Sequence, residues 1–205
     1  MKRLFIFPYN GNCIEAIDCI GNQYELVGII DDTSEKQGKS EYGYMVYPRE
    51  ELLKNKENFI LAIPGSPTSY SHRAKIISGL NVSSEKFATV IHPSAIVSPM
   101  AKIGKNVLIM AGVVITSNAV IEDHVCILPN TVVHHDVVIK KYTLIGSNVS
   151  IAGHTQVGEN CYIGSGTRII NNIVIGDKTL VGLGSNVIKS IPAGSKVVGN
   201  PARLI

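Results

Sequence analysis

Apolar residues recur at a strict interval of six along the second half of the chain. From Ile91 to Val187, seventeen successive positions six residues apart are all Ile or Val. Four residues after each of them stands a small or β-branched residue, such as Ala95, Thr131 or Cys161. An α-helix needs apolar residues every three or four positions, and a half-buried strand needs them every second position. A period of six instead predicts short flat strands joined by corners, wound into a three-sided coil.

Three hexads make one turn of this coil, so residues eighteen apart in the sequence are expected on neighbouring coils. The coils should stack at the spacing of paired β-strands, about 4.8 Å. The unbroken register from residue 91 to residue 191 predicts five to six coils of a parallel β-helix. Periodicity alone does not determine the hand of the coil.

The first 85 residues have a different pattern, in which apolar runs alternate with segments of helical spacing. Strands are predicted at 4–7, 26–30 and 59–64, and helices at 13–21 and 72–80. Such alternation predicts a small Rossmann-like sheet with parallel strands. We therefore expect an α/β domain over residues 1–85, a β-helix over residues 86–191 and a tail over residues 192–205.

Composition restricts the class of protein. Of the 205 residues, 45% are hydrophobic and 17% charged, enough for a folded core. The formal net charge of +3, without a long basic run, gives no support for a nucleic-acid or membrane-surface partner. No apolar stretch reaches the length of a membrane span or of a signal sequence. The four cysteines have no CxxC spacing and are expected to be reduced, mostly buried thiols of a cytoplasmic protein.

Polar residues follow each predicted strand of the first domain, at the sheet edge where α/β proteins bind ligands. The first loop lacks the GxGxxG pattern, and its Pro8 has no N–H to donate, which argues against a nicotinamide-dependent dehydrogenase. An acidic pair follows the second strand, where it could bind a ribose or sugar hydroxyl or could simply be a solvated strand end or helix cap. The candidate substrate-binding residues are Asn10, Gly11, Asn12, Asp31, Asp32 and Gly65.

Histidine and aspartate stand together at one corner of the predicted coil. Val133 and Val137 are the inward pair of their hexad, so His134, His135 and Asp136 should lie outside the core. Histidine is the natural base near neutral pH. His135 and Asp136 are therefore the candidate base and its acidic partner.

The eighteen-residue turn places His135 beneath Gly153 and Asp136 beneath His154. Acyl transfer from a thioester needs a base for the acceptor's proton and a donor for the developing oxyanion. A glycine leaves its backbone N–H open to such a carbonyl oxygen. His154 could contact the acyl group or simply pair with the carboxylate of Asp136.

The [Ile/Val]-Gly-x-x-[small]-x repeat resembles that of the hexapeptide-repeat acyltransferases, whose coil is left-handed. The order of the two domains resembles the bacterial family of sialic acid O-acetyltransferases and UDP-4-amino-sugar N-acetyltransferases. The resemblance implies acetyl-CoA as co-substrate, a nucleotide-sugar held by the first domain, a homotrimer and no metal. Where that family shows Gly-Gly-His after the first strand, this chain has Asn10-Gly11-Asn12, without the histidine.

The family's Val-x-His-Asp motif is matched by residues 133–136, which implies that His135 is the general base and Asp136 its companion. The family also holds the thioester carbonyl with a main-chain amide, here that of Gly153. The pantetheine arm is expected between neighbouring β-helices, near backbone groups of Ser165, Gly166 and Leu183. Two exposed cations could meet the CoA phosphates or remain idle: Lys189 and Arg203.

The resemblance implies N-acetylation of a nucleotide-linked amino sugar in bacterial glycan biosynthesis. O-acetylation of a sugar hydroxyl, as on a sialic acid, remains an alternative that the sequence does not exclude. A non-catalytic β-helix is a further alternative, as is a zinc-binding relative of the γ-class carbonic anhydrases. The three metal-binding histidines of those enzymes lie at a wider spacing than His134 and His135.

Overall fold

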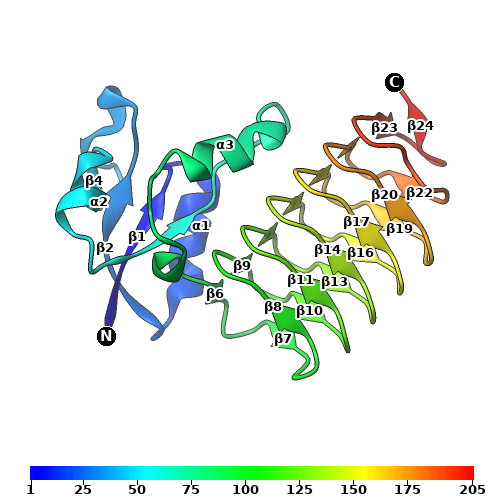
Figure 1. Cartoon of the computed structure of the whole chain (residues 1–205), viewed down its shortest axis with the longest axis horizontal. Coiled ribbons are helices and arrows are strands. Elements are labelled where there is room, and N and C mark those ends of the chain that lie inside the picture. The colour runs from blue at the N-terminus through cyan, green and yellow to red at the C-terminus, as the bar shows by residue number, and fades with distance from the viewer.

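The computed structural model describes residues 1–205, except for the side chain of Leu53. The chain forms an α/β unit followed by a long column of coils, with the two termini at opposite ends of the molecule (Figure 1). Of the described helices, none is both long enough and apolar enough to cross a membrane.

The α/β unit is built around a five-stranded sheet with the order β3-β4-β2-β1-β5. Strands β4, β2, β1 and β5 are parallel, whereas β3 is antiparallel to β4. The predicted strands and helices of this unit are confirmed, but β3, β4 and α2 were not predicted. The elements are β1 (Lys2–Phe7), α1 (Gly11–Ile20), β2 (Tyr24–Ile30), η1 (Ser34–Lys36), β3 (Gly38–Lys39), β4 (Met45–Tyr47), α2 (Glu50–Lys54), β5 (Phe59–Ala62), η2 (Tyr70–His72), α3 (Arg73–Ser78) and η3 (Ser84–Lys86).

The second part is a parallel β-helix whose strands pair at the predicted interval of eighteen residues. Val114, for example, pairs with Val132, and Val132 pairs with Ser150. The strands are β6 (Val90–Ile91), β7 (Ile96–Val97), β8 (Lys102–Ile103), β9 (Leu108–Ile109), β10 (Val114–Ile115), β11 (Val120–Ile121), β12 (Cys126–Ile127), β13 (Val132–Val133), β14 (Val138–Ile139), β15 (Leu144–Ile145), β16 (Ser150–Ile151), β17 (Gln156–Val157), β18 (Tyr162–Ile163), β19 (Arg168–Ile169), β20 (Val174–Ile175), β21 (Leu180–Val181), β22 (Asn186–Val187), β23 (Lys196–Val198) and β24 (Arg203–Leu204).

Three sheets form the sides of the β-helix. The first sheet runs from β7 to β22, the second from β8 to β20, and the third from β6 to β24. We call the corner after the first sheet, with residues 134–136 and 152–154, the first corner. The second corner, with residues 122–124 and 140–142, follows the second sheet. The third corner, with residues 146–148 and 164–166, follows the third sheet.

The predicted inward residues fill the column. Beyond the first coil the Ile and Val positions are almost fully buried, as Ile127 and Ile163 illustrate. Threonines at the small-residue positions are also buried, because each hydroxyl finds an acceptor on the next coil. Thr131 Oγ1 donates to the carbonyl of Gly146 at 2.7 Å. A satisfied hydroxyl is tolerated in an apolar interior.

The corners impose a backbone conformation at every sixth residue. From Asn106 to Gly184, each of these positions has a positive φ, and most are Asn or Gly. Short polar residues and glycine are the residues that tolerate this left-handed region. Asp136 (φ 58°) and His154 (φ 58°) both occupy such positions at the first corner.

The α/β unit packs on the third sheet through α1. Buried side chains of α1, among them Cys13 and Cys19, form one apolar cluster with Leu108 and Cys126 of the β-helix. All four cysteines are free and buried, as predicted from the sequence. Burial raises the pKa of Cys13 to about 12 and that of Cys126 to about 11, so the thiols stay protonated.

The segment expected as a tail continues the third sheet. β23 pairs in parallel with β21, and β24 returns antiparallel to β23. Residues 196–204 therefore add two strands at the C-terminal end of the column.

Candidate active site

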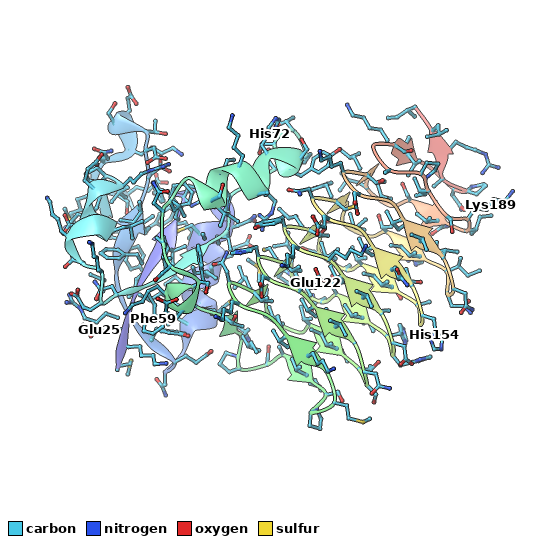
Figure 2. The ribbon with its side chains drawn as sticks, viewed as in Figure 1. Glu25, Phe59, His72, Glu122, His154 and Lys189 are labelled. Carbon is cyan, nitrogen blue, oxygen red and sulfur yellow. The ribbon has the colours of Figure 1, made fainter. Side chains whose placement is uncertain are left out.

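His135 and Asp136 are in direct contact at the first corner. His135 Nδ1 lies 2.8 Å from Asp136 Oδ2, and both side chains are partly exposed. His154, one coil further along, lies with its Nε2 3.9 Å from the same carboxylate oxygen. The two imidazoles meet edge to face, with ring centroids 5.0 Å apart. Figure 2 shows His154 on the edge of the β-helix away from the α/β unit.

The carboxylate of Asp136 determines which nitrogen of His135 carries a proton. Hydrogen bonds from His135 and from Asn118 hold the pKa of Asp136 below its ordinary value, so it is ionised at neutral pH. An ionised carboxylate only accepts hydrogen bonds, so Nδ1 of His135 must be the protonated nitrogen. Nε2 is then left with a free lone pair, which is the state a general base requires.

Gly153 lies over the imidazole of His135, as the eighteen-residue spacing predicts. A Cβ atom at residue 153 would come within 2.6 Å of both Cε1 and Nε2 of His135. Among the described residues, none accepts a hydrogen bond from the Gly153 N–H, whereas the N–H of His154 donates to His135 O at 3.1 Å. Gly153, whose N–H has no acceptor, therefore lies beside the basic nitrogen, and such a free backbone donor is the kind of group that stabilises an oxyanion.

Residues predicted to line the CoA groove lie on a different corner. Ser165, Gly166 and Leu183 belong to the third corner, which the first sheet separates from His135. Leu183 is 68% exposed, and Ser165 Oγ accepts a hydrogen bond from the Ser147 N–H at 3.0 Å. A single chain therefore does not bring these residues to the candidate base.

Lys189 and Arg203 come together at the C-terminal end of the column. Both line a cavity of about 320 Å³ with Ile188 and Leu204. Lys189 lies three coils beyond His135 in the same column of first-corner residues, and it projects from the edge that carries His154 (Figure 2).

The six candidate substrate-binding residues gather around two adjoining cavities of the α/β unit. One cavity of about 480 Å³ is lined by Asn10, Asp31, Asp32 and Gly65. The other, of about 290 Å³, adds residues of the β-helix to the first loop and is lined by Asn10, Gly11, Asn12, Gly65, Ser66, Pro67, Leu128, Leu144 and Tyr162. Because the carboxyl ends of parallel strands meet at one sheet edge, residues far apart in sequence share these walls.

The two acidic residues already have partners. Asp31 is 3% exposed and accepts hydrogen bonds from the backbone N–H groups of Tyr9 and Thr33, each at 2.9 Å. Asp31 also forms an ion pair with Lys36, whose Nζ lies 3.3 Å from Oδ2. Asp31 therefore secures the first loop, whereas the more exposed Asp32, which lines the larger cavity, forms a two-pronged ion pair with Arg49. The burial of Asp31 differs from the solvated strand end that the sequence allowed, and its three partners leave little of the carboxylate free for a sugar hydroxyl.

Asn10 has a structural role in the first loop, whose sequence differs from the Gly-Gly-His of the resembling family. Its side-chain oxygen accepts a hydrogen bond from the Cys13 N–H at 2.9 Å and so caps α1. The loop thus ends in a standard helix cap and still lines both cavities.

The other histidines have different surroundings. His92 bonds Ser94 within its own turn, with 2.8 Å between Nδ1 and Oγ, as expected of a structural residue. His72 and His134 are exposed. His124 is half-buried against Tyr142, and its desolvation lowers its pKa to about 4.

Sequence reasoning missed two residues near these sites. Asn118 donates to Asp136 Oδ1 at 3.2 Å, and it stands eighteen residues before Asp136, so the coil spacing could have identified it. Arg73 is fully buried and donates to the carbonyls of Pro64, His124 and Tyr142. No local sequence pattern predicts a buried arginine whose acceptors are backbone carbonyls so distant in the sequence.

Comparison with known proteins agrees with this architecture. The family model described as bacterial transferase hexapeptide (six repeats) matches residues 100–135, 118–153 and 136–171. A sequence search of curated proteins finds no match.

Solved structures match over the whole chain. PerB from Caulobacter crescentus, solved with CoA and GDP-perosamine, is 26% identical, with a TM-score of 0.87 over 100% of this chain and 97% of that one. The acetyltransferase domain of PglB from Neisseria gonorrhoeae, solved with acetyl coenzyme A, is 24% identical, with a TM-score of 0.86 over 100% and 99%. WeeI from Acinetobacter baumannii is 24% identical, with a TM-score of 0.87 over 100% of both chains. The resemblance to the hexapeptide-repeat sugar acetyltransferases, expected from the sequence, is therefore confirmed.

Proposed function

We propose that this protein transfers an acetyl group from acetyl-CoA to the amino group of a nucleotide-linked amino sugar. The observation that carries the proposal is the contact of His135 with Asp136 beneath Gly153, whose N–H has no acceptor. PerB, solved with CoA and GDP-perosamine, has the same fold over the whole chain and supports this substrate class.

The chemistry follows from the protonation state of the site. The neutral sugar amine attacks the thioester carbonyl, and Nε2 of His135 accepts the proton that the amine loses. The Gly153 N–H donates to the oxyanion that forms on the carbonyl. When the intermediate collapses, the C–S bond breaks and the sulfur leaves as CoA thiol with the proton held by His135. Asp136 keeps the imidazole oriented and stabilises its charged form.

The site is completed, in this proposal, by a second chain. His135 occupies the first corner, whereas Ser165, Gly166 and Leu183 occupy the third, and the first sheet separates them. A homotrimer with the β-helices side by side would bring the first corner of one chain to the third corner of its neighbour. The pantetheine arm would then lie between the chains, with Lys189 or Arg203 near the CoA phosphates.

Uncovered apolar side chains on the β-helix support the trimer. The first sheet presents the neighbouring residues Val114 and Val132 outward, and the second presents the neighbouring residues Val120 and Val138, with Val174 separated from them by Gln156. Val174 is 48% exposed in the single chain. Contiguous apolar surface of this kind marks interfaces between proteins.

The hand of the coil and the roles of the two domains belong to the same proposal. We infer a left-handed coil and a Rossmann-like nucleotide-sugar-binding domain over residues 1–85, joined to an acyltransferase domain over residues 86–191. The cavities lined by Asn10, Gly65 and Tyr162 would receive the nucleotide-sugar. The larger cavity offers Asp32, Thr33 and Ser66 as polar groups for its ribose or base.

The test is acetyl transfer by purified protein across a panel of sugars. We expect thiol release with nucleotide-linked amino sugars and none with sugars that carry only hydroxyl groups. Thiol release with hydroxyl sugars such as sialic acids would instead select O-acetylation, and no release with any acceptor would contradict the proposal.

Two neighbouring histidines provide a matched pair of variants. His135→Ala should lower kcat by about 10²–10⁴ because it removes the base. His134→Ala should retain activity, because the exposed His134 lies outside the contact with Asp136. A fall of less than about tenfold in His135→Ala would contradict the assignment of the base.

A further inference from the structure

Three side chains of the first corner have the composition and geometry of a metal site. His135, Asp136 and His154 each offer one ligand atom, and these atoms all lie within 4.8 Å of one another. Asp136 Oδ2 is 2.8 Å from His135 Nδ1 and 3.9 Å from His154 Nε2. Two ligands at about 2.1 Å from one tetrahedral ion are about 3.4 Å apart, so rotations of the exposed imidazoles that draw the more distant ligand atoms together would complete the site.

The surrounding backbone holds these ligands in place. Asp136 and His154 occupy the positive-φ corner positions of successive coils, and the His154 N–H donates to the carbonyl of His135. Asn118 donates to the other oxygen of Asp136 and so orients the carboxylate. Second-layer contacts of this kind raise metal affinity. In the single chain the imidazoles are more than half exposed, and in the proposed trimer the groove that admits acetyl-CoA would also admit an ion.

The donor set selects one class of ion. Two imidazole nitrogens and one carboxylate oxygen suit Zn²⁺ and its neighbours Ni²⁺ and Cu²⁺. Mg²⁺ and Ca²⁺ prefer several oxygen ligands, and this cluster offers a single carboxylate. Three protein ligands also leave a fourth position open to water.

We propose that His135, Asp136 and His154 bind a zinc-class divalent ion and that the bound ion stops acetyl transfer. The inhibition rests on the proposed function, but the binding does not. An ion on Nε2 of His135 would occupy the lone pair that accepts the amine proton. An ion on Nδ1 would displace the proton there and leave Nε2 protonated. In both arrangements His135 is no longer a base.

Binding is measured first, without substrates. Chelator-treated, tag-free protein is titrated with ZnCl₂ by calorimetry, and with CoCl₂ by visible absorption, which reports the coordination of the ion. We expect one ion per chain and no binding of MgCl₂. His154→Ala should weaken Zn²⁺ binding by at least about tenfold, whereas His134→Ala should not change it. Equal Zn²⁺ binding by wild-type protein and His154→Ala would overturn the site.

Inhibition is measured next, and the two results separate the proposals. Micromolar ZnCl₂ should abolish thiol release by wild-type protein, and a chelator should restore it. Zinc that binds to a metal-free protein with no transferase activity would contradict the proposed function and leave the site standing. Active enzyme that neither binds zinc nor is inhibited by it would overturn the site and leave the function standing. Active enzyme that binds zinc at the cluster without loss of rate would overturn the inhibition.

Discussion

Gly153 leaves room for the imidazole of His135. A Cβ atom at this position would lie 2.6 Å from two ring atoms, and the ring, as the movable partner, would have to shift. Gly153 does not have a positive φ, so alanine can adopt its backbone conformation. Gly153→Ala should therefore lower kcat by about tenfold or more through misplacement of the base. Its melting temperature should stay close to that of wild type.

Ser117→Ala is the control for this variant. Ser117 stands one coil before His135 in the same column of the first corner, and among the described residues its hydroxyl makes no hydrogen bond with the imidazole. Steady-state kinetics and thermal melting of the two variants make the comparison. A Gly153→Ala enzyme with unchanged kcat would show that the position of the ring is not important.

His124 should make the stability of the fold depend on pH. Asn106 Nδ2 lies 3.0 Å from its Nδ1, and Asn106 also holds the backbone of Ala62, so Nδ1 must accept and the ring must be neutral. Burial lowers the pKa of His124 to about 4 from 6.5. Between pH 6.5 and about pH 4, the unfolded chain therefore binds a proton at this residue that the folded chain does not bind. Stability is complete above pH 6.5 and falls toward pH 4.

The expected loss from this group is about 1–2 kcal/mol, because partial exposure weakens the effect. Urea unfolding of wild-type protein and His124→Asn at pH 7 and pH 4.5 measures it. Asparagine suits the positive φ of this corner and does not titrate. The variant should lose less stability on acidification than wild type, and parallel losses in both proteins would contradict this role of His124.

At the scale of elements, the segment from η2 to α3 attaches the α/β unit to four successive coils. Arg73 donates to the carbonyls of His124 (2.7 Å) and Tyr142 (2.8 Å), the Ala74 N–H donates to Asn160, and Tyr70 Oη donates to Lys178 O. These four acceptors lie eighteen residues apart along the second corner. Figure 1 shows α3 beside this edge of the column. Because the coil is regular, one hydrogen-bond acceptor for this segment recurs at the same corner of each coil.

Arg73 should link this attachment to substrate binding. It also donates to Pro64 O and packs against Gly65, which lines both cavities of the α/β unit. Arg73→Met would leave one buried and two partly buried carbonyls without a donor, at a cost of about 3 kcal/mol. We expect a lower melting temperature and a higher KM for the nucleotide-sugar, with a smaller change in KM for acetyl-CoA.

Lys75→Met is the matched control, since Lys75 is exposed on the same helix. Arg73→Lys keeps the positive charge, but its ammonium group cannot reach all three carbonyls. This variant therefore distinguishes the role of the charge from that of the three hydrogen bonds. An Arg73 variant whose two KM values rise equally would indicate general loss of structure.

The sequence predicted the β-helix in detail because each hexad repeats one local requirement, an inward Ile or Val followed by a small residue. The same spacing correctly placed His135 beneath Gly153. It could not predict β4, whose three residues pair in the sheet only through long-range contacts. It also left open the role of Asp31, because the Tyr9 N–H that occupies this carboxylate is 22 residues away. Such partners are determined by tertiary structure and leave no periodic signal.

At the scale of the whole molecule, the separation of the first and third corners makes the proposed trimer testable by complementation. His135→Ala removes the base at the first corner. Leu183→Trp should fill the proposed CoA groove at the third corner without disturbing the interior, since Leu183 is 68% exposed. Each variant alone should be inactive.

Co-expressed in equal amounts, the two variants should recover activity if each site takes its base from one chain and its groove from the next. A site works only where a Leu183→Trp chain supplies His135 to a His135→Ala neighbour, which happens in about one quarter of the sites of randomly mixed trimers. Wild type mixed with a chain carrying both substitutions is the control. Sites shared between chains again predict about one quarter, whereas sites contained within one chain predict about one half. Sites contained within one chain predict no activity for the two single variants, because no chain in that mixture retains both intact corners. Inactive mixed trimers would therefore contradict a shared site.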